Sequence, residues 1–212
     1  MNESCVFVGP TRVKKDVYPS IDFFPPAALG SVYRAMERGY RRIAIVDGFF
    51  GNTPSVWHKE ILFAISKGFE VSGAASTGAL RASELAPYGM RGIGNIYRLY
   101  RRASIADDDE VCVTHAIAEM DFMPLSEPMI SIRYTLRDLR HRGAVSRDEE
   151  AKIAAELKAA HFSERTLERI RAAIARHLPD DRAAAVADGF MAARRDAKGD
   201  DARRLLDWLS RP

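Results

Sequence analysis

The segment from Val71 to Leu85, VSGAASTGALRASEL, decides the fold of this chain. An apolar, strand-like run passes through Ala74-Ala-Ser-Thr-Gly78 and continues directly into a helical pattern. Small residues allow the tight turn by which a strand leads into a helix, and a serine at such an elbow is exposed at the carboxyl edge of a sheet. The segment therefore predicts a β-strand, a sharp turn at Ser76 and a helix.

The same alternation of strand and helix extends along the chain on both sides of this elbow. Strand-like runs occupy residues 5–9, 43–47 and 69–75, helical patterns occupy 27–38, 54–67 and 77–85, and a fourth strand is expected at 111–114. Apolar strands that alternate with helices are typical of parallel sheets buried on both faces. We therefore expect a doubly wound, mostly parallel α/β sheet of the Rossmann-like type, with binding sites at the carboxyl ends of its strands.

The composition changes near Gly143. Beyond it, Ala, Arg, Glu and Asp surround regularly spaced Leu and Ile, which is a helical pattern throughout. Ser146-Arg-Asp-Glu149 is a capping-box sequence that marks one helix start, and breaks between helices are expected at 179–181 and 198–201. The sequence thus predicts an α/β core domain over residues 1–125 and an all-helical C-terminal part over 126–212.

Composition and charge exclude several classes of protein. Of the 212 residues, 47% are hydrophobic and 29% are charged, with a net charge of +3. These values are typical of a globular chain, and neither half is strongly basic, which argues against a nucleic-acid-binding protein. No apolar run approaches the roughly 20 residues of a membrane span, and the N-terminal stretch lacks a basic start. Cys5 and Cys112 lie in apolar runs and are expected to be buried and reduced. We therefore expect a cytoplasmic protein.

Ser76 is the first candidate catalytic residue. The free amide N–H groups at the start of the following helix could stabilise an oxyanion or hold a phosphate, which makes Thr77 and Gly78 candidate binding residues. The alternative is that Ser76 only caps this helix and that its small neighbours serve close packing. Arg81, one turn into the helix, is expected to approach an anionic group beside Ser76 or to pair with Glu84 or Glu110.

A second string, VDGFFGNTPSVWHKEIL over residues 46–62, supplies further candidates. Asp47 closes an apolar strand, so its carboxylate is expected at the same sheet edge as Ser76. His58 lies near the start of the next helix. Asp47, His58 and Ser76 are the three residue types of an acyl-transfer triad, whose chain order differs among unrelated enzymes. The alternatives are that Asp47 caps a turn and that His58 is a half-buried packing residue.

Other residues near this edge complete the list of candidates. His115 is the main rival to His58 as the base, and Lys59 and Glu60 are alternative participants. The glycine-rich run 88–95 fits neither nucleotide-binding signature and is expected to be a mobile loop, and the acidic run 107–110 is expected to be a solvated turn. No histidine or cysteine has metal-ligand spacing, so neither a metal nor a cofactor is expected. The predicted substrate-binding residues are Gly9, Thr11, Gly48, Asn52, Lys59, Thr77 and Gly78.

Four strings together carry a resemblance to a known family. They are VDGFFGNTPSVWHKE (46–60), GAASTGALRASEL (73–85), YGMRGIG (88–94) and DDDEV (107–111). In these strings the sequence resembles the TfuA family, which is named for trifolitoxin biosynthesis. The resemblance covers about half of the chain, and it departs from the expected pattern at Thr77, where methionine is expected.

The resemblance implies a partner protein of YcaO enzymes, the ATP-dependent catalysts of peptide-backbone modification. It implies hydrolysis of the C-terminal thiocarboxylate of a ThiS-like sulfur-carrier protein, which releases sulfide for backbone thioamidation, with the precursor peptide as a further partner. The family's Asp, His, Ser and Arg positions correspond to Asp47, His58, Ser76 and Arg81. Two alternatives remain open: a non-catalytic docking protein that recruits peptide or carrier to YcaO, and a phosphate or nucleotide binder.

Overall fold

The computed structural model describes residues 2–51 and 53–211. Its contacts divide the chain into two compact units. The α/β unit comprises the described residues of Met1–Asp108, Ile117–Met123 and Lys198–Pro212, and the helical unit comprises Asp109–Ala116 and Pro124–Ala197. Among the described residues, no helix is both long enough and apolar enough to cross a membrane.

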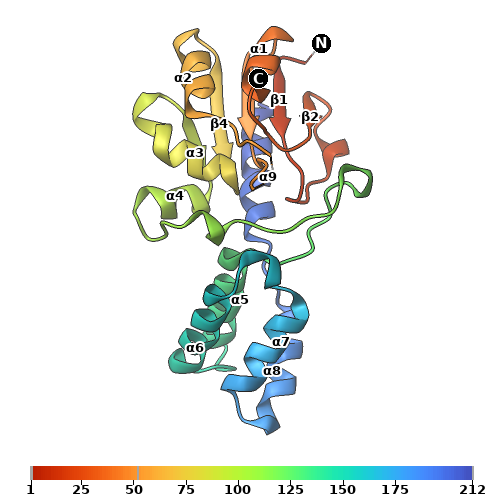
Figure 1. Cartoon of the computed structure of the whole chain (residues 1–212), viewed down its shortest axis with the longest axis vertical. Coiled ribbons are helices and arrows are strands. Elements are labelled where there is room, and N and C mark those ends of the chain that lie inside the picture. The colour runs from red at the N-terminus through yellow and green to blue at the C-terminus, as the bar shows by residue number, and fades with distance from the viewer. Residues whose placement is uncertain (1, 52, 212) are drawn as a thin grey trace. The chain divides into compact units, whose positions relative to one another are not determined.

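The α/β unit is built on a five-stranded parallel sheet with the strand order β2-β1-β3-β4-β5 (Figure 1). Its register aligns Phe7 with Ile45, and Ile45 with Gly73. The parallel sheet and its helical connections confirm the predicted doubly wound α/β fold. The strands are β1 (Ser4–Phe7), β2 (Ile21–Phe24), β3 (Arg42–Ile45), β4 (Glu70–Ala74) and β5 (Arg91–Ile93).

Helices cover both faces of this sheet because its strands are apolar on both faces. On β3, Ile43 and Ile45 pack with one group of helices, and Ala44 packs on the opposite face. The first face contacts α1 (Ser31–Glu37), α2 (His58–Ser66) and α3 (Thr77–Leu85), and the second contacts α9 (Ala197–Leu209). α4 (Asn95–Arg101) follows β5. The runs of fully buried residues along β3 reflect this burial on both sides.

The last helix, α9, belongs to the α/β unit although it is the last element of the chain. Leu205, Leu206 and Leu209 are buried against the sheet face that carries Ala44 and Ala74. The predicted boundary at 125/126 assigned this helix to the C-terminal part, whereas the contacts group it with the sheet. The predicted break at 179–181 overlaps the observed one, because α7 ends at His177 and α8 begins at Asp180. The break predicted at 198–201 lies earlier in the structure, between the end of α8 at Ala192 and the start of α9 at Ala197.

Two strands differ from the sequence-based expectation. β2 was not predicted, and β5 lies in the glycine-rich run that was expected to be a loop. β5 is short, and its backbone pairs with β4 from Ser72 to Ala74, so its strand conformation depends on its neighbour. Residues 111–114 form no strand in the structure. Cys5 is buried as expected, and this burial raises the pKa of its thiol to about 12, whereas Cys112 is only partly buried.

The helical unit consists of four helices: α5 (Met129–His141), α6 (Arg147–Ala159), α7 (Leu167–His177) and α8 (Asp180–Ala192). The predicted capping box is present at the start of α6. The Ser146 N–H donates to a Glu149 carboxylate oxygen at 2.7 Å, and the Glu149 N–H donates to the Ser146 hydroxyl at 3.2 Å. The apolar sides of these helices form a core of their own.

The acidic run is solvated only at Asp107 and Asp108, and the expectation of a solvated turn was wrong for Asp109 and Glu110. Asp109 forms ion pairs with Lys158 and with the fully buried Arg165. A guanidinium nitrogen of Arg165 lies 2.5 Å from a carboxylate oxygen of Asp109. Glu110 is also buried, and it accepts two hydrogen bonds from Arg133 at 2.9 and 3.0 Å. Buried charges need such partners because leaving water is costly for them. Asp109 and Glu110 therefore fix the start of segment 109–116 within the helical unit.

This cluster predicts how the helical unit responds to acid. Burial raises the pKa of Asp109, but hydrogen bonds from Lys158 and Arg165 outweigh it and hold that pKa below its ordinary value of 3.8. The resulting stabilisation is present above pH 3.8 and is lost as the pH falls through the lowered pKa. We expect helicity, followed by far-ultraviolet circular dichroism, to fall in that range. An Asp109→Asn variant should be less stable at neutral pH and should show a shallower acid dependence, and an unchanged dependence would contradict this assignment.

Candidate active site

The predicted elbow after β4 is present and carries backbone strain. Ala75 has φ of +65°, a left-handed conformation that costs energy for a residue with a side chain. The Ser76 N–H donates to the Ala74 carbonyl at 2.9 Å, which closes a three-residue γ-turn of the uncommon type. Such strain concentrates at functional sites. The Ser76 side chain makes no capping hydrogen bond to α3, so N-capping does not explain the serine. Ser76 is only 6% exposed, so the expected exposure of this serine at the sheet edge was wrong.

Glycines allow the start of α3 to press against the sheet. The Gly78 N–H donates to the Val46 carbonyl at 3.2 Å, and a Cβ on Gly78 would overlap the Ile45 carbonyl oxygen. A Cβ on Gly73 would in turn overlap the Gly78 carbonyl oxygen. Gly78, predicted as a binding residue, therefore has a packing role in the structure, which fixes Ser76 beside the carboxyl end of β3.

One backbone donor remains at this helix start. The N–H groups of Gly78, Ala79 and Leu80 all have acceptors, at Val46 for the first and at the Ser76 carbonyl for the others. Within the described residues, the Thr77 N–H has no such acceptor. The N–H of the residue after the nucleophile is the donor that stabilises an oxyanion in elbow-type hydrolases. The backbone at Thr77 is therefore placed for that task.

Asp47 lies at the same edge and is almost fully buried. One carboxylate oxygen accepts from the N–H groups of Gly9 and Thr11, at 3.0 and 2.9 Å, and the other accepts from the Thr11 hydroxyl at 2.8 Å. Gly9 and Thr11, both predicted as substrate-binding residues, thus use these donors to bind Asp47. With these contacts Asp47 joins the loop after β1 to the end of β3, which is a positioning role.

Lys198 is a member of this edge that sequence reasoning missed. Its side chain is only 5% exposed, and its Nζ lies 3.4 Å from the carboxylate of Asp47. The lysine comes from the first turn of α9, about 150 residues farther along the chain. In the sequence it stands in the run Lys198-Gly-Asp-Asp201, which reads as a helix break. Burial of a lysine leaves no local sequence signal, because it depends on which helix covers the sheet.

His58 and Asp47 do not contact each other as the triad pattern suggested. The His58 Nε2 lies 2.7 Å from Glu84, and Arg81 donates to the same carboxylate oxygen at 2.9 Å. Arg81 also donates to the Val56 carbonyl at 3.3 Å. Pairing with Glu84 was one of the two alternatives for Arg81, and the structure shows it. The carboxylate that orients His58 is therefore Glu84.

The remaining predicted residues do not form one group in the structure. A Cβ on Gly48 would lie 3.0 Å from the Thr77 side chain, so the loop after β3 passes beside the start of α3. Lys59 is exposed on α2, and the adjacent Glu60 is buried, where it accepts from the Val32 N–H at 2.9 Å. Asn52 lies outside the described residues. His115 belongs to the helical unit.

The described residues contain no group of three or more His, Cys, Asp or Glu side chains that could hold a metal ion.

A model of the TfuA-like protein family matches residues 47–166, which is more than half of the chain. The match begins at Asp47 and includes His58, Ser76 and Arg81, but it ends before Lys198. A comparison with curated proteins found no match. The TfuA-like family is associated with YcaO-dependent biosynthesis. The match over residues 47–166 shows that this chain belongs to the TfuA-like protein family.

Proposed function

We propose that this protein hydrolyses the C-terminal thiocarboxylate of a ThiS-like sulfur-carrier protein and so supplies sulfide to a YcaO enzyme that installs thioamides. The observation that carries the proposal is the strained γ-turn at Ala75, which holds the buried Ser76 between a strand end and a helix start. Family membership supports the YcaO partnership. The carrier, the precursor peptide and the hydrolase activity are parts of the proposal.

The chemistry is acyl transfer at a carbonyl carbon. The Ser76 Oγ attacks the thiocarboxylate carbon, its proton passes to a base, and the tetrahedral intermediate expels hydrosulfide to leave an acyl-serine. Water then attacks the acyl-serine, which releases the carrier carboxylate and restores the hydroxyl. The net reaction consumes one water and yields one hydrogen sulfide for each thiocarboxylate. The Thr77 N–H is the proposed donor to the oxyanion.

The proposed base is His58, oriented by Glu84. A carboxylate bound to one imidazole nitrogen fixes the ring and stabilises the imidazolium that forms, as in hydrolase triads. Arg81 holds Glu84 from the other side at 2.9 Å. Asp47 has a positioning role in this proposal, because its carboxylate holds the loop that follows β1. Hydrosulfide is a better leaving group than an amine, so this reaction requires less of its base than peptide hydrolysis does.

The test is sulfide release from a thiocarboxylated ThiS-like carrier at substoichiometric protein. A Ser76→Ala variant should lose turnover by at least about 10³-fold, because the nucleophile is removed. The matched control is Ser72→Ala on β4. The Ser72 hydroxyl is buried and has no hydrogen-bond partner among the described residues, so this variant should fold and retain full turnover. Full turnover by Ser76→Ala would remove Ser76 from the mechanism.

A docking role is the second candidate, and exposed aromatic residues favour it. On the α/β unit, Trp57 is 56% exposed, and Tyr33 and Phe63 are 40% and 43% exposed with ring centroids 5.5 Å apart. Exposed aromatic side chains are common at sites of protein association. A docking protein would release no sulfide from the carrier alone but would stimulate thioamidation by the complete YcaO system, so the same assay separates the two functions.

A further inference from the structure

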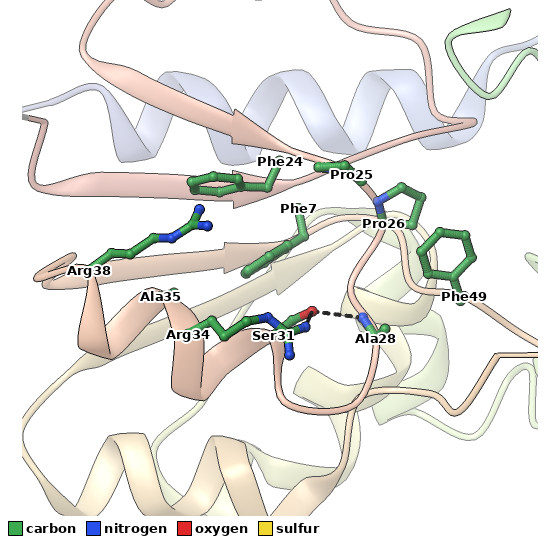
Figure 2. Close-up of a pocket in the computed structure, with 10 residues that line it drawn as sticks. All are labelled: Phe7, Phe24, Pro25, Pro26, Ala28, Ser31, Arg34, Ala35, Arg38 and Phe49. Carbon is green, nitrogen blue, oxygen red and sulfur yellow. Dashed lines mark hydrogen bonds between the residues drawn. The ribbon is translucent and has the colours of Figure 1, made fainter. Parts of the chain in front are cut away.

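A cavity of about 270 Å³ lies at the carboxyl ends of β1 and β2, beside α1 (Figure 2). Its walls are mostly apolar, and its two charged groups are Arg34 of α1 and Arg38, the residue that follows α1. In the sheet order, β1 and β3 separate β2 from β4, so this cavity is distinct from the elbow at Ser76. The lining residues are Phe7, Phe24, Pro25, Pro26, Ala28, Ser31, Arg34, Ala35, Arg38 and Phe49.

The charges of this cavity are unbalanced. Arg34 on α1 and Arg38, which directly follows α1 in a helical conformation, are four residues apart, where two like charges repel each other. No acidic residue is among the lining residues, and within the described part of the chain neither arginine forms an ion pair. An anion between the two guanidinium groups would relieve this repulsion and would accept charge-assisted hydrogen bonds.

The two arginines are held in place by the cavity itself. The Arg38 guanidinium carbon lies 5.1 Å from the centroid of the Phe24 ring, and Figure 2 shows it beside the rings of Phe24 and Phe7. Arg34 donates to the Ser31 hydroxyl at 3.2 Å, and that hydroxyl accepts from the Ala28 N–H at 2.9 Å. Partial immobilisation of both side chains lowers the entropy cost of binding an anion.

The size and surroundings of the cavity favour a peptide over an enclosed small molecule. Pockets for drug-sized ligands are typically about 300–1,000 Å³, so this cavity fits roughly one bulky side chain. Two apolar residues that adjoin lining residues in the sequence are also exposed, Leu29 to 38% and Phe50 to 53%. A ligand that fills the cavity with one side chain and continues over these exposed residues is a chain segment.

We propose that this cavity binds an acidic peptide segment, with one bulky apolar side chain against Phe7, Phe24 and Phe49 and an adjacent carboxylate between Arg34 and Arg38. The proposal is independent of hydrolysis at Ser76, because it uses none of the residues assigned to that reaction. It gives the protein a second recognition site on the α/β unit, specific for an apolar residue followed by acidic ones.

The experiment measures binding of an acetylated Gly-Phe-Glu-Glu-Gly amide to the full chain by isothermal titration calorimetry. Two altered peptides, with Ala in place of Phe or Gln in place of both Glu, should each bind about tenfold more weakly or not at all. Arg34→Gln and Arg38→Gln should each weaken the parent peptide about tenfold, because each removes a charge-assisted contact. The matched control is Arg98→Gln, an exposed arginine on α4, which should bind as the wild type does.

Several outcomes would overturn the proposal. Parent-peptide binding weaker than about 1 mM would do so, as would equal binding of all three peptides. Equal loss in Arg98→Gln would indicate non-specific attraction to positive charge. Binding of free 3-phenylpropionate as tight as that of the parent peptide would show that the cavity takes a small carboxylate, and that the peptide assignment is wrong.

Discussion

Gly78→Ala is expected to destabilise the α/β unit by about 3 kcal/mol or more and to abolish any function of the elbow. The added Cβ would overlap the Ile45 carbonyl oxygen, and the Ile45 carbonyl carbon would lie 2.6 Å from it. Both atoms belong to the backbone of a central strand, which cannot move aside as a flexible side chain can. The start of α3 would have to leave the sheet, and with it the hydrogen bond from Gly78 to Val46.

Denaturant unfolding followed by tryptophan fluorescence measures this effect. The chain has two tryptophans, Trp57 and Trp208, and both belong to the α/β unit, so their emission reports on that unit. The matched control is Gly189→Ala within α8, where the nearest atom to the added Cβ is a Leu139 methyl carbon at 3.7 Å. Alanine should stabilise that helix by up to about 1 kcal/mol, because glycine is the poorer helix former. A Gly78→Ala variant as stable as the wild type would contradict the close packing of α3 on β3.

Asp47→Ala is expected to cost the α/β unit about 3–5 kcal/mol, the range for removing one member of a buried charged pair. The substitution leaves the N–H groups of Gly9 and Thr11 and the Thr11 hydroxyl without their acceptor. It also removes the carboxylate that lies 3.4 Å from the Lys198 Nζ. Buried donors without an acceptor carry their full desolvation cost. The loops that end β1 and β3 should lose their fixed arrangement.

Two further substitutions divide this effect into its parts. Asp47→Asn keeps an oxygen for the two backbone donors but removes the negative charge next to Lys198, so it should cost less than Asp47→Ala. Thr11→Val removes one hydroxyl and should cost about 1 kcal/mol. The same fluorescence-detected unfolding applies to all three. An Asp47→Ala variant within about 0.5 kcal/mol of the wild type would show that the network does not stabilise the unit.

Much of the fold was predictable because its signals are local. The predicted helix at 77–85 coincides with α3, and the strands expected at 5–9, 43–47 and 69–75 correspond to β1, β3 and β4. β5 was not predictable in this way, because three residues that include a glycine become a strand only through pairing with β4. The burial of Asp109 and Glu110 was also hidden, since it depends on Arg133, Lys158 and Arg165 from helices that follow later in the chain.

The candidate site divides in the same way. The position of Ser76 at a sheet edge follows from a strand, a run of small residues and a helix, all within one segment. The pairing of each carboxylate with its cation does not follow from any one segment of the sequence. The sequence suggested that Asp47 would orient His58, whereas the structure pairs His58 with Glu84 at 2.7 Å. Both pairings satisfy the residue types of a triad, and only the direction of α2 relative to α3 distinguishes them.

The sequence by itself therefore determined the parallel α/β architecture, the elbow at Ser76 and the family, because strand periodicity, small-residue turns and motif strings are properties of neighbouring residues. Only the tertiary structure decided that α9 covers the second face of the sheet and brings Lys198 to Asp47. It also decided that Arg34 and Arg38 lie beside an aromatic cavity. The physical reason is that burial and ion pairing between distant segments depend on how the helices pack on the sheet, and residue spacing does not encode that packing.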